Sequence, residues 1–152
     1  MWKTSLAVMA FLAFMTHAAL AESQTPTRTE DPIDAWMGAA MDQVVSTPEM
    51  VEVYTQAAKK WDDRLNRVYK ACLAKLKKPQ DRATLKEAQR KWLAYREAER
   101  DLINAVCYFT PDGSPAGTIA QVIAPGKLVE LLRERVLRLE DYLKILEGQG
   151  SL

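Results

Sequence analysis

The sequence predicts an all-α fold in which a long antiparallel helical hairpin has an N-terminal helix and a C-terminal helix packed against it. Three observations lead to this prediction. Apolar residues recur every three or four positions along most of the chain after residue 30, which is the spacing of one helix face. Capping residues and prolines divide this pattern into separate helices. The two longest stretches are joined by only about three residues, so they should fold back on each other.

The N-terminal residues have the three parts of an export signal. Lys3 and the amino terminus are its positive end, residues 6–15 are an unbroken apolar run, and Ala19-Leu20-Ala21 fits the cleavage site. The apolar run is too short to span a bilayer, which takes about 20 residues. We therefore expect residues 1–21 to be a cleaved signal peptide, and the mature protein to be periplasmic or secreted without a membrane anchor. An uncleaved anchor is the alternative.

Capping residues set the start of the first two helices. Residues 22–30 are polar and lack large apolar side chains, which favours a flexible linker. Asp31 followed by Pro32 is typical of an N-cap with proline at the first helical position. Ser46 followed by Glu49 indicates a second helix start, with an acid placed favourably for the helix dipole. The second helix has its apolar stripe at Met50, Val53, Ala57, Trp61, Leu65, Val68, Cys72 and Leu76.

Proline also separates the remaining helices. Pro79 should end the second helix, and Asp81 should cap the third. Residues 110–117 contain two prolines and two glycines and predict a loop. Residues 118–124 could form one or two helical turns, and Pro125 should open the last helix. The third helix has its apolar stripe at Leu85, Ala88, Trp92, Tyr95, Ala98, Leu102, Ala105 and Phe109. The last helix has its stripe at Leu128, Leu132, Val136, Leu139, Leu143 and Leu146.

The residue inventory argues against catalysis. The single histidine, His17, lies in the signal, so the mature chain can form neither a histidine-dependent triad nor a zinc site with histidine. A carboxylate pair stays open, with Asp62, Glu99 and Asp101 as its candidates. Acidic and basic residues balance once Lys3 is removed, which gives no general attraction to nucleic acid or anionic membrane. We therefore predict a protein that is not an enzyme and uses no metal or cofactor.

Several polar residues should face inward across the hairpin. Residues equally far from a turn near residue 79 face each other, which sets Asp62 opposite Arg96 and brings Asn66 and Tyr69 close to Gln89. The favoured interpretation is a structural network that fixes helix register, and a ligand or catalytic site is the alternative. Loss of Asp62 should leave Arg96 uncompensated and cost about 3 kcal/mol or more.

The two cysteines of the mature chain should stay unpaired. An exported protein meets oxidising conditions, which favour disulfides. In the predicted hairpin, however, Cys107 lies about 20 residues along from Cys72, or roughly 30 Å at the helical rise. A disulfide needs Cα atoms within about 7 Å. Cys72 lies on the apolar stripe and should be a small core residue.

Two motifs resemble those of the LprI-type lysozyme-inhibitor domain, a family of small exported helical bacterial domains. They are Trp61-Asp62-x-x-Leu65-Asn66-x-x-Tyr69 and Ala88-Gln89-Arg90-x-Trp92-Leu93-x-Tyr95-Arg96-x-Ala98-Glu99. Leu131-x-x-x-Arg135 resembles the family's final helix, and the likeness covers about residues 40–143. We expect one such domain over residues 31–147 and a disordered tail over residues 148–152. The resemblance implies a non-catalytic protein whose partner is a lysozyme.

The cysteines depart from the family's pattern. The family usually has cysteines near the positions of Ala40, Val53, Arg100 and Lys127, and all four are replaced here. The disulfides that normally staple such domains are therefore expected to be absent. Stability must then come from packing, without the roughly 2–4 kcal/mol that a disulfide adds.

Two surfaces are candidates for protein binding. An inhibitor needs a projecting element, and the loop after the third helix offers Tyr108, Phe109, Asp112 and Ser114 for that role. Its proline and glycine turns would limit the ordering cost on binding, although a plain connector is an equal alternative. The second hypothesis is a periplasmic interaction or assembly protein with another envelope partner. It would use an exposed apolar surface on the last helix at Val129 and Leu137.

Overall fold

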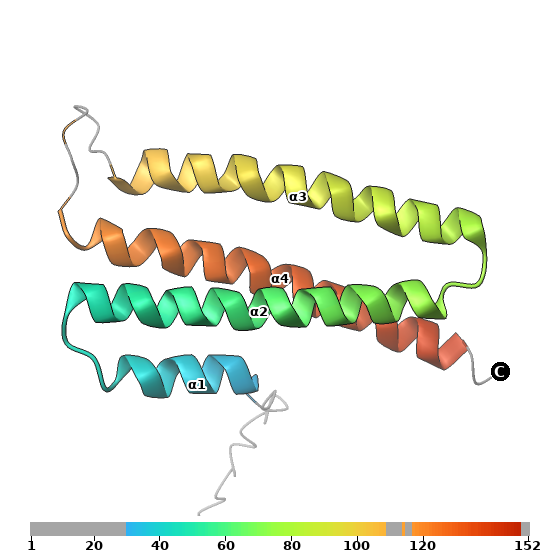
Figure 1. Cartoon of the computed structure of the whole chain (residues 1–152), viewed down its shortest axis with the longest axis horizontal. Coiled ribbons are helices and arrows are strands. Elements are labelled where there is room, and N and C mark those ends of the chain that lie inside the picture. Colours follow the sequence, from blue (N-terminus) through green and yellow to red (C-terminus); the bar gives the residue numbers. More distant parts are fainter. Residues whose placement is uncertain (1–29, 109–113, 115–116, 150–152) are drawn as a thin grey trace, which may run out of the picture.

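Over the residues that the structure describes, the chain forms the four helices drawn in Figure 1. The computed structural model describes residues 30–108, 114 and 117–149. The helices are α1 (Pro32–Met41), α2 (Thr47–Lys75), α3 (Pro79–Tyr108) and α4 (Ala120–Gln149), and no strand occurs in these ranges. The all-α prediction is confirmed. The predicted signal peptide, linker residues 22–29 and residues 150–152 of the predicted tail lie outside the described residues.

The first two helices begin where the capping chemistry predicts. The Asp31 carboxylate accepts a hydrogen bond from the Ile33 backbone N–H at 2.9 Å, and Pro32 is the first helical residue. Ser46 and Glu49 form a reciprocal capping box, in which each side chain accepts a hydrogen bond from the other residue's backbone N–H. Both caps satisfy N–H groups that a helix start otherwise leaves unpaired.

Three predicted boundaries are wrong. Helix α3 begins at Pro79, two residues before Asp81, because proline lacks the N–H that the first turn would leave unpaired. Helix α4 begins at Ala120 and contains Pro125. Ala120 and Ala124 are almost fully buried, so packing compensates for the single hydrogen bond that the proline removes. At its other end α4 continues to Gln149, two residues into the predicted tail.

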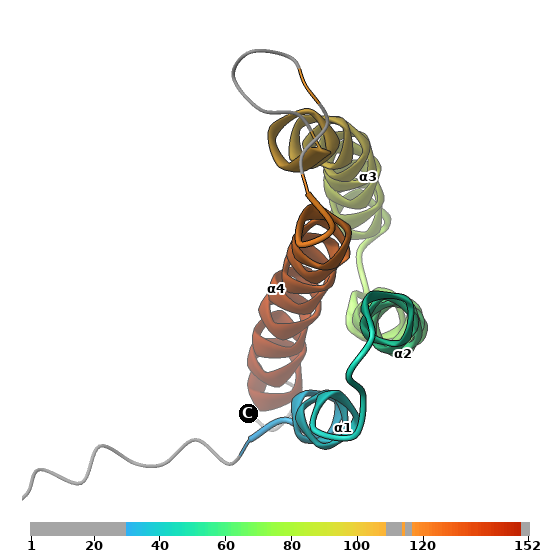
Figure 2. The same ribbon diagram turned by 90° about the vertical axis from the view of Figure 1, so that its left-hand side faces the viewer.

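Helix α4 is the centre of the packing. Helices α2 and α3 run antiparallel after a short turn, and each packs against α4, while α1 packs against α2. Figure 2 looks along the helices and shows α3 and α1 at opposite edges, with α4 and α2 between them. The buried core cluster joins α2 and α4 and consists of Ala57, Trp61, Leu65, Val68, Cys72, Val129, Leu132, Val136 and Leu139. The predicted stripes of both helices therefore form the core.

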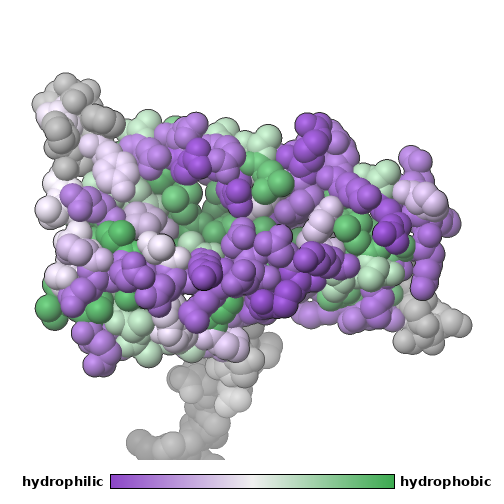
Figure 3. Space-filling model, in the orientation of Figure 1, coloured by the Kyte–Doolittle hydropathy of each residue, from purple (hydrophilic) through white to green (hydrophobic). Residues whose placement is uncertain are grey.

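Helix α3 presents a face that is rotated from the predicted one, although Leu85 and Trp92 of the predicted stripe do pack against the core cluster. Tyr95 and Leu102 are half exposed, and Ala88, Ala98 and Ala105 are also exposed. The two buried residues of α3 are Gln89 and Ile103. Because α3 packs mainly on α4, the helix is rotated so that a mixed polar and apolar face points inward. Figure 3 shows mainly hydrophilic side chains over α2, with hydrophobic ones visible in the hollow between α2 and α3.

Candidate functional site

The predicted polar pair joins the two arms of the hairpin. Arg96 of α3 lies 3.4 Å from the Asp62 carboxylate of α2. Asn66 donates to both the backbone oxygen and the carboxylate of Asp62, at 3.0 and 3.1 Å. Arg96 also pairs with Glu97 of its own helix at 3.1 Å. Asp62 is 45% exposed and Arg96 is 29% exposed, so this network lies at the surface edge of the interface.

The other motif residues point toward α4. Gln89 is buried, and its side-chain oxygen accepts hydrogen bonds from Arg135 of α4 at 2.9 and 3.2 Å. The guanidinium groups of Arg96 and Arg135 lie 5.5 and 5.7 Å from the Trp92 ring centre. Tyr69 packs against the core cluster, while the Gln89 side chain bonds to Arg135. The motif thus divides into an α2–α3 pair and an α3–α4 cluster around Trp92.

The exposure of this pair changes the expected effect of Asp62→Ala. An ion pair that is about one-third to one-half exposed contributes roughly 0–1 kcal/mol, and Arg96 keeps Glu97 as a second partner. We therefore expect a loss of at most about 1 kcal/mol in the free energy of unfolding, measured by urea denaturation. Asp63→Ala, at an exposed neighbouring position, is the matched control. A loss above about 3 kcal/mol in the free energy of unfolding would contradict this and would show that Arg96 is left as a buried charge without a partner, as the sequence alone predicted.

A second charge network, which sequence reasoning missed, ties three helices together. Arg64 of α2 bonds to the α1 cap Asp31 at 2.6 Å and to Glu140 of α4 at 2.7 Å. Desolvation is the largest single effect on the pKa of Arg64, and it lowers that pKa. The hydrogen bonds and charges of Glu140 and Asp31 together outweigh it, so the pKa of Arg64 is raised. All three side chains are less than one-quarter exposed. The sequence does contain one indication of this network. Arg64 follows Trp61 by three residues and so lies at the edge of the buried stripe of α2.

The network encloses the largest fully buried side chain. Trp61 has no exposed surface, and the guanidinium groups of Arg64 and Arg133 lie 5.2 and 5.9 Å from its ring centre. Arg133 is held by Asp34 of α1 at 2.7 Å. The arrangement buries the tryptophan under paired cations and fixes α1 across α2 and α4, which is a structural role.

The predicted binding loop is only partly described. Tyr108 ends α3 and is half-buried, and Ser114 is exposed. Phe109 and Asp112 lie outside the described residues. Tyr108 therefore lies at the end of the molecule where α3 stops and α4 starts. Both helices also carry exposed apolar side chains.

These apolar side chains form a patch that we call the α3 flank, made of Tyr95, Leu102, Val106 and Ile123. Their exposures are 51%, 55%, 68% and 45%. The three α3 residues are spaced by seven and four positions and so share one side of the helix. Tyr95 interacts with Glu134 of α4, and Ile123 lies three turns before Glu134 on the same α4 face. The α3 flank therefore continues from α3 onto α4.

The other predicted protein-binding surface does not exist. Val129 is 3% exposed and belongs to the core, and Leu137 is half-buried. Val129 is buried because it lies on the face of α4 that joins the core cluster, whereas the exposed face of α4 over this stretch is charged, at Lys127, Glu130 and Glu134. The exposed apolar surface of this end of the molecule lies on the α3 flank instead.

The candidate carboxylates have other partners. Asp62 pairs with Arg96, and Asp101 pairs with Arg100 at 3.6 Å. The charge of Glu99 raises the pKa of Tyr95, with smaller effects from desolvation, from their hydrogen bond and from Glu134. Within residues 30–108 and 117–149, no group of three acidic or cysteine side chains is arranged to hold a metal ion.

Two further features bear on the chemistry of the chain. Cys72 and Cys107 are both free thiols, the first buried and the second half-buried. Burial raises the pKa of the Cys72 thiol, so this side chain favours its neutral form. Among the helices of the described ranges, none combines the length and the apolar character that crossing a membrane requires.

Comparison with known proteins identifies the family. Residues 38–139 match the family described as lysozyme inhibitor LprI. This range holds both motifs, the Trp61 core and the whole of α2 and α3. No curated protein and no solved structure matches the chain. Because the match spans more than half of the sequence and most of its helical part, the chain belongs to the lysozyme inhibitor LprI family.

Proposed function

We propose that this protein is an exported, non-catalytic inhibitor of a cell-wall lysozyme. The observation that supports this most strongly is the family match over residues 38–139. The chemistry agrees with it, because an inhibitor needs a rigid surface and no nucleophile or general base. The N-terminal residues fit a signal peptide cleaved after Ala21. Export would bring the mature chain to the compartment in which lysozymes act.

The α3 flank is the proposed core of the interface. Contiguous exposed apolar side chains on a small protein mark interaction surfaces. Charged side chains border this patch, with Asp101 on α3 and Lys127 and Glu130 on α4 all more than half exposed. An apolar centre inside a charged rim is the usual anatomy of a protein interface. The loop residues Tyr108, Phe109, Asp112 and Ser114 are proposed to extend this surface into the enzyme's cleft.

The direct test is a titration of lysozyme with the mature protein that begins at Glu22. The titration uses a lysozyme concentration above the dissociation constant of the complex. The rate of hydrolysis of cell-wall substrate should then fall linearly with added protein and reach zero near one equivalent of protein per enzyme. Lysozymes of several classes are compared, because the family does not specify the class. If a sample that circular dichroism shows to be helical inhibits none of them, the proposal is wrong. The α3 flank would then serve another envelope partner, to be sought by pull-down.

A further inference from the structure

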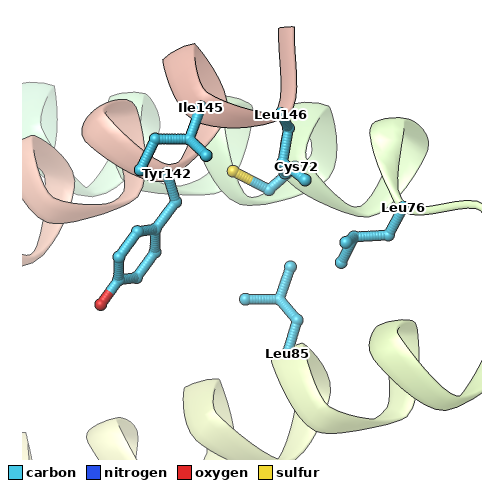
Figure 4. A pocket seen from close by; sticks show the side chains of 6 residues that line it. All are labelled: Cys72, Leu76, Leu85, Tyr142, Ile145 and Leu146. Carbon is cyan, nitrogen blue, oxygen red and sulfur yellow. The ribbon is translucent and has the colours of Figure 1, made fainter. Parts of the chain in front are cut away.

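A small apolar pocket lies at the end of the molecule that carries the α2–α3 turn, far along the helices from the α3 flank. Its volume is about 260 Å³, and its walls are Cys72, Leu76, Leu85, Tyr142, Ile145 and Leu146. Figure 4 shows side chains of α2, α3 and α4 converging on it. The polar atoms in these walls are the Cys72 sulfur and the Tyr142 hydroxyl. Such a space favours an apolar occupant over water.

Arg135 lies outside the walls of this pocket but is connected to them along α3 and through the core, and it precedes the wall residue Tyr142 by two turns of α4. Its partner Gln89 follows the wall residue Leu85 by four residues on α3, which is about 6 Å along the helix axis. On α4, Arg135 precedes Leu139 by four residues, and the Leu139 carbonyl accepts a hydrogen bond from the Cys72 thiol at 3.4 Å. Arg135 also acts electrostatically on both Cys72 and Tyr142. Arg135 is not a wall residue itself, but its guanidinium lies close enough to the apolar pocket to act electrostatically on two of its walls.

The charge of Arg135 lacks a carboxylate partner. No acidic side chain of the described ranges lies within 4.0 Å of it, and its hydrogen bonds go to the neutral Gln89. Other half-buried arginines of the chain, Arg64 and Arg96, each have at least one acid. Desolvation lowers the pKa of Arg135, and the like charge of Arg138 acts in the same direction. A guanidinium in this situation gains most from an added anion.

We propose that this pocket, together with Arg135, binds a small amphiphilic carboxylate, with the apolar tail in the pocket and the carboxylate at the guanidinium. Charge complementarity selects the head group, and the apolar walls select the tail. A cavity of roughly 150 Å³ holds a benzene ring, so this pocket has room for a tail of roughly ten carbons. Trp92 and Gln89 position the guanidinium, the first through its ring and the second through two hydrogen bonds. The inference does not depend on lysozyme inhibition, since it concerns the other end of the molecule.

The test measures binding of decanoate to the mature protein by isothermal titration calorimetry, with decanol as the uncharged probe. Decanoate should bind more tightly than decanol. Arg135→Gln should weaken decanoate binding at least about tenfold, because a charge-assisted hydrogen bond is lost, and should leave decanol binding unchanged. Arg67→Gln, which removes the charge of an exposed α2 arginine, should retain wild-type affinity. Circular dichroism checks that each variant is folded.

Cys72 reports independently whether the tail enters the pocket. In a Cys107→Ser variant, Cys72 is the one thiol of the mature chain. Decanoate at ten times its dissociation constant should slow the reaction of Cys72 with a small thiol reagent about tenfold. The proposal is overturned if decanoate does not bind, if decanol binds equally well, if Arg135→Gln binds like the wild type, or if Cys72 is not protected. None of these results bears on the lysozyme titration, so failure of one proposal is distinguishable from failure of the other.

Discussion

Replacing Trp61 with alanine is expected to lower the free energy of unfolding by about 3–5 kcal/mol, the usual cost of deleting a buried aromatic side chain. Trp61 has no exposed surface and contacts the α2–α4 core. Its loss would also remove the ring on which Arg64 and Arg133 lie. Since small domains are stable by only about 5–15 kcal/mol, this one change would remove a large share of the total.

The measurement is thermal and urea denaturation of the mature protein, with Trp61→Phe and Trp92→Ala as comparisons. A loss of this size should lower the melting temperature by about 10–20 °C. Trp61→Phe should cost clearly less, because it retains most of the ring and removes a buried indole N–H that has no hydrogen-bond partner among the described residues. Trp92→Ala should also cost less, because Trp92 is half-buried. A Trp61→Ala protein that melts within a few degrees of the wild type would show that the α2–α4 core does not hold the fold.

Features governed by neighbouring residues could be predicted from the sequence. The Asp31 cap and the Ser46–Glu49 capping box form between residues two or three positions apart, so their chemistry is visible in the sequence itself. The stripe of α2 was also predictable, because its apolar residues are separated by strongly polar ones. The hairpin register placed Asp62 opposite Arg96 because a turn of about three residues leaves little freedom.

The rotation of α3 could not be predicted in the same way. Its apolar residues follow a helical period, which correctly indicates a helix, but the period does not say which neighbour the helix will meet. Packing on α4 brings Gln89 inward to Arg135 and leaves Leu102 at the surface. The burial of Gln89 can be understood only from its hydrogen bond to Arg135, which is 46 residues away in the sequence. The Arg64 network depends on three helices in the same way.

The positions at which the resemblance led us to expect cysteines have other interactions in this chain. Val53 is buried at 7% exposure, and Arg100 and Lys127 form ion pairs with acids on their own helices. Exposed pairs of this kind contribute about 0.3–0.5 kcal/mol each, much less than the roughly 2–4 kcal/mol of a disulfide. The contacts between helices must therefore supply the difference, which is why single core residues such as Trp61 have large expected effects.

Val106→Asp and Leu102→Asp are each expected to weaken lysozyme inhibition by about 2–4 kcal/mol, or roughly 30- to 1000-fold, as changes at the centre of an interface do. Both side chains are more than half exposed in the free protein, so the fold should tolerate the charge. In the proposed complex the same carboxylate would be taken out of water into an apolar contact without a partner, which is costly. The loss should therefore appear in the inhibition constant and not in the melting temperature.

Leu93→Asp is the matched control on the same helix. Leu93 lies nine residues before Leu102, or two and a half turns, so it is on the opposite side of α3, and it is 39% exposed. It should inhibit like the wild type. If Val106→Asp and Leu102→Asp also retain full inhibition, the α3 flank is not the interface, and the loop residues Tyr108, Phe109, Asp112 and Ser114 are the next positions to substitute. If all three variants lose inhibition equally, the effect comes from charge on α3 in general, because a contact confined to one side of a helix cannot respond to substitutions on both.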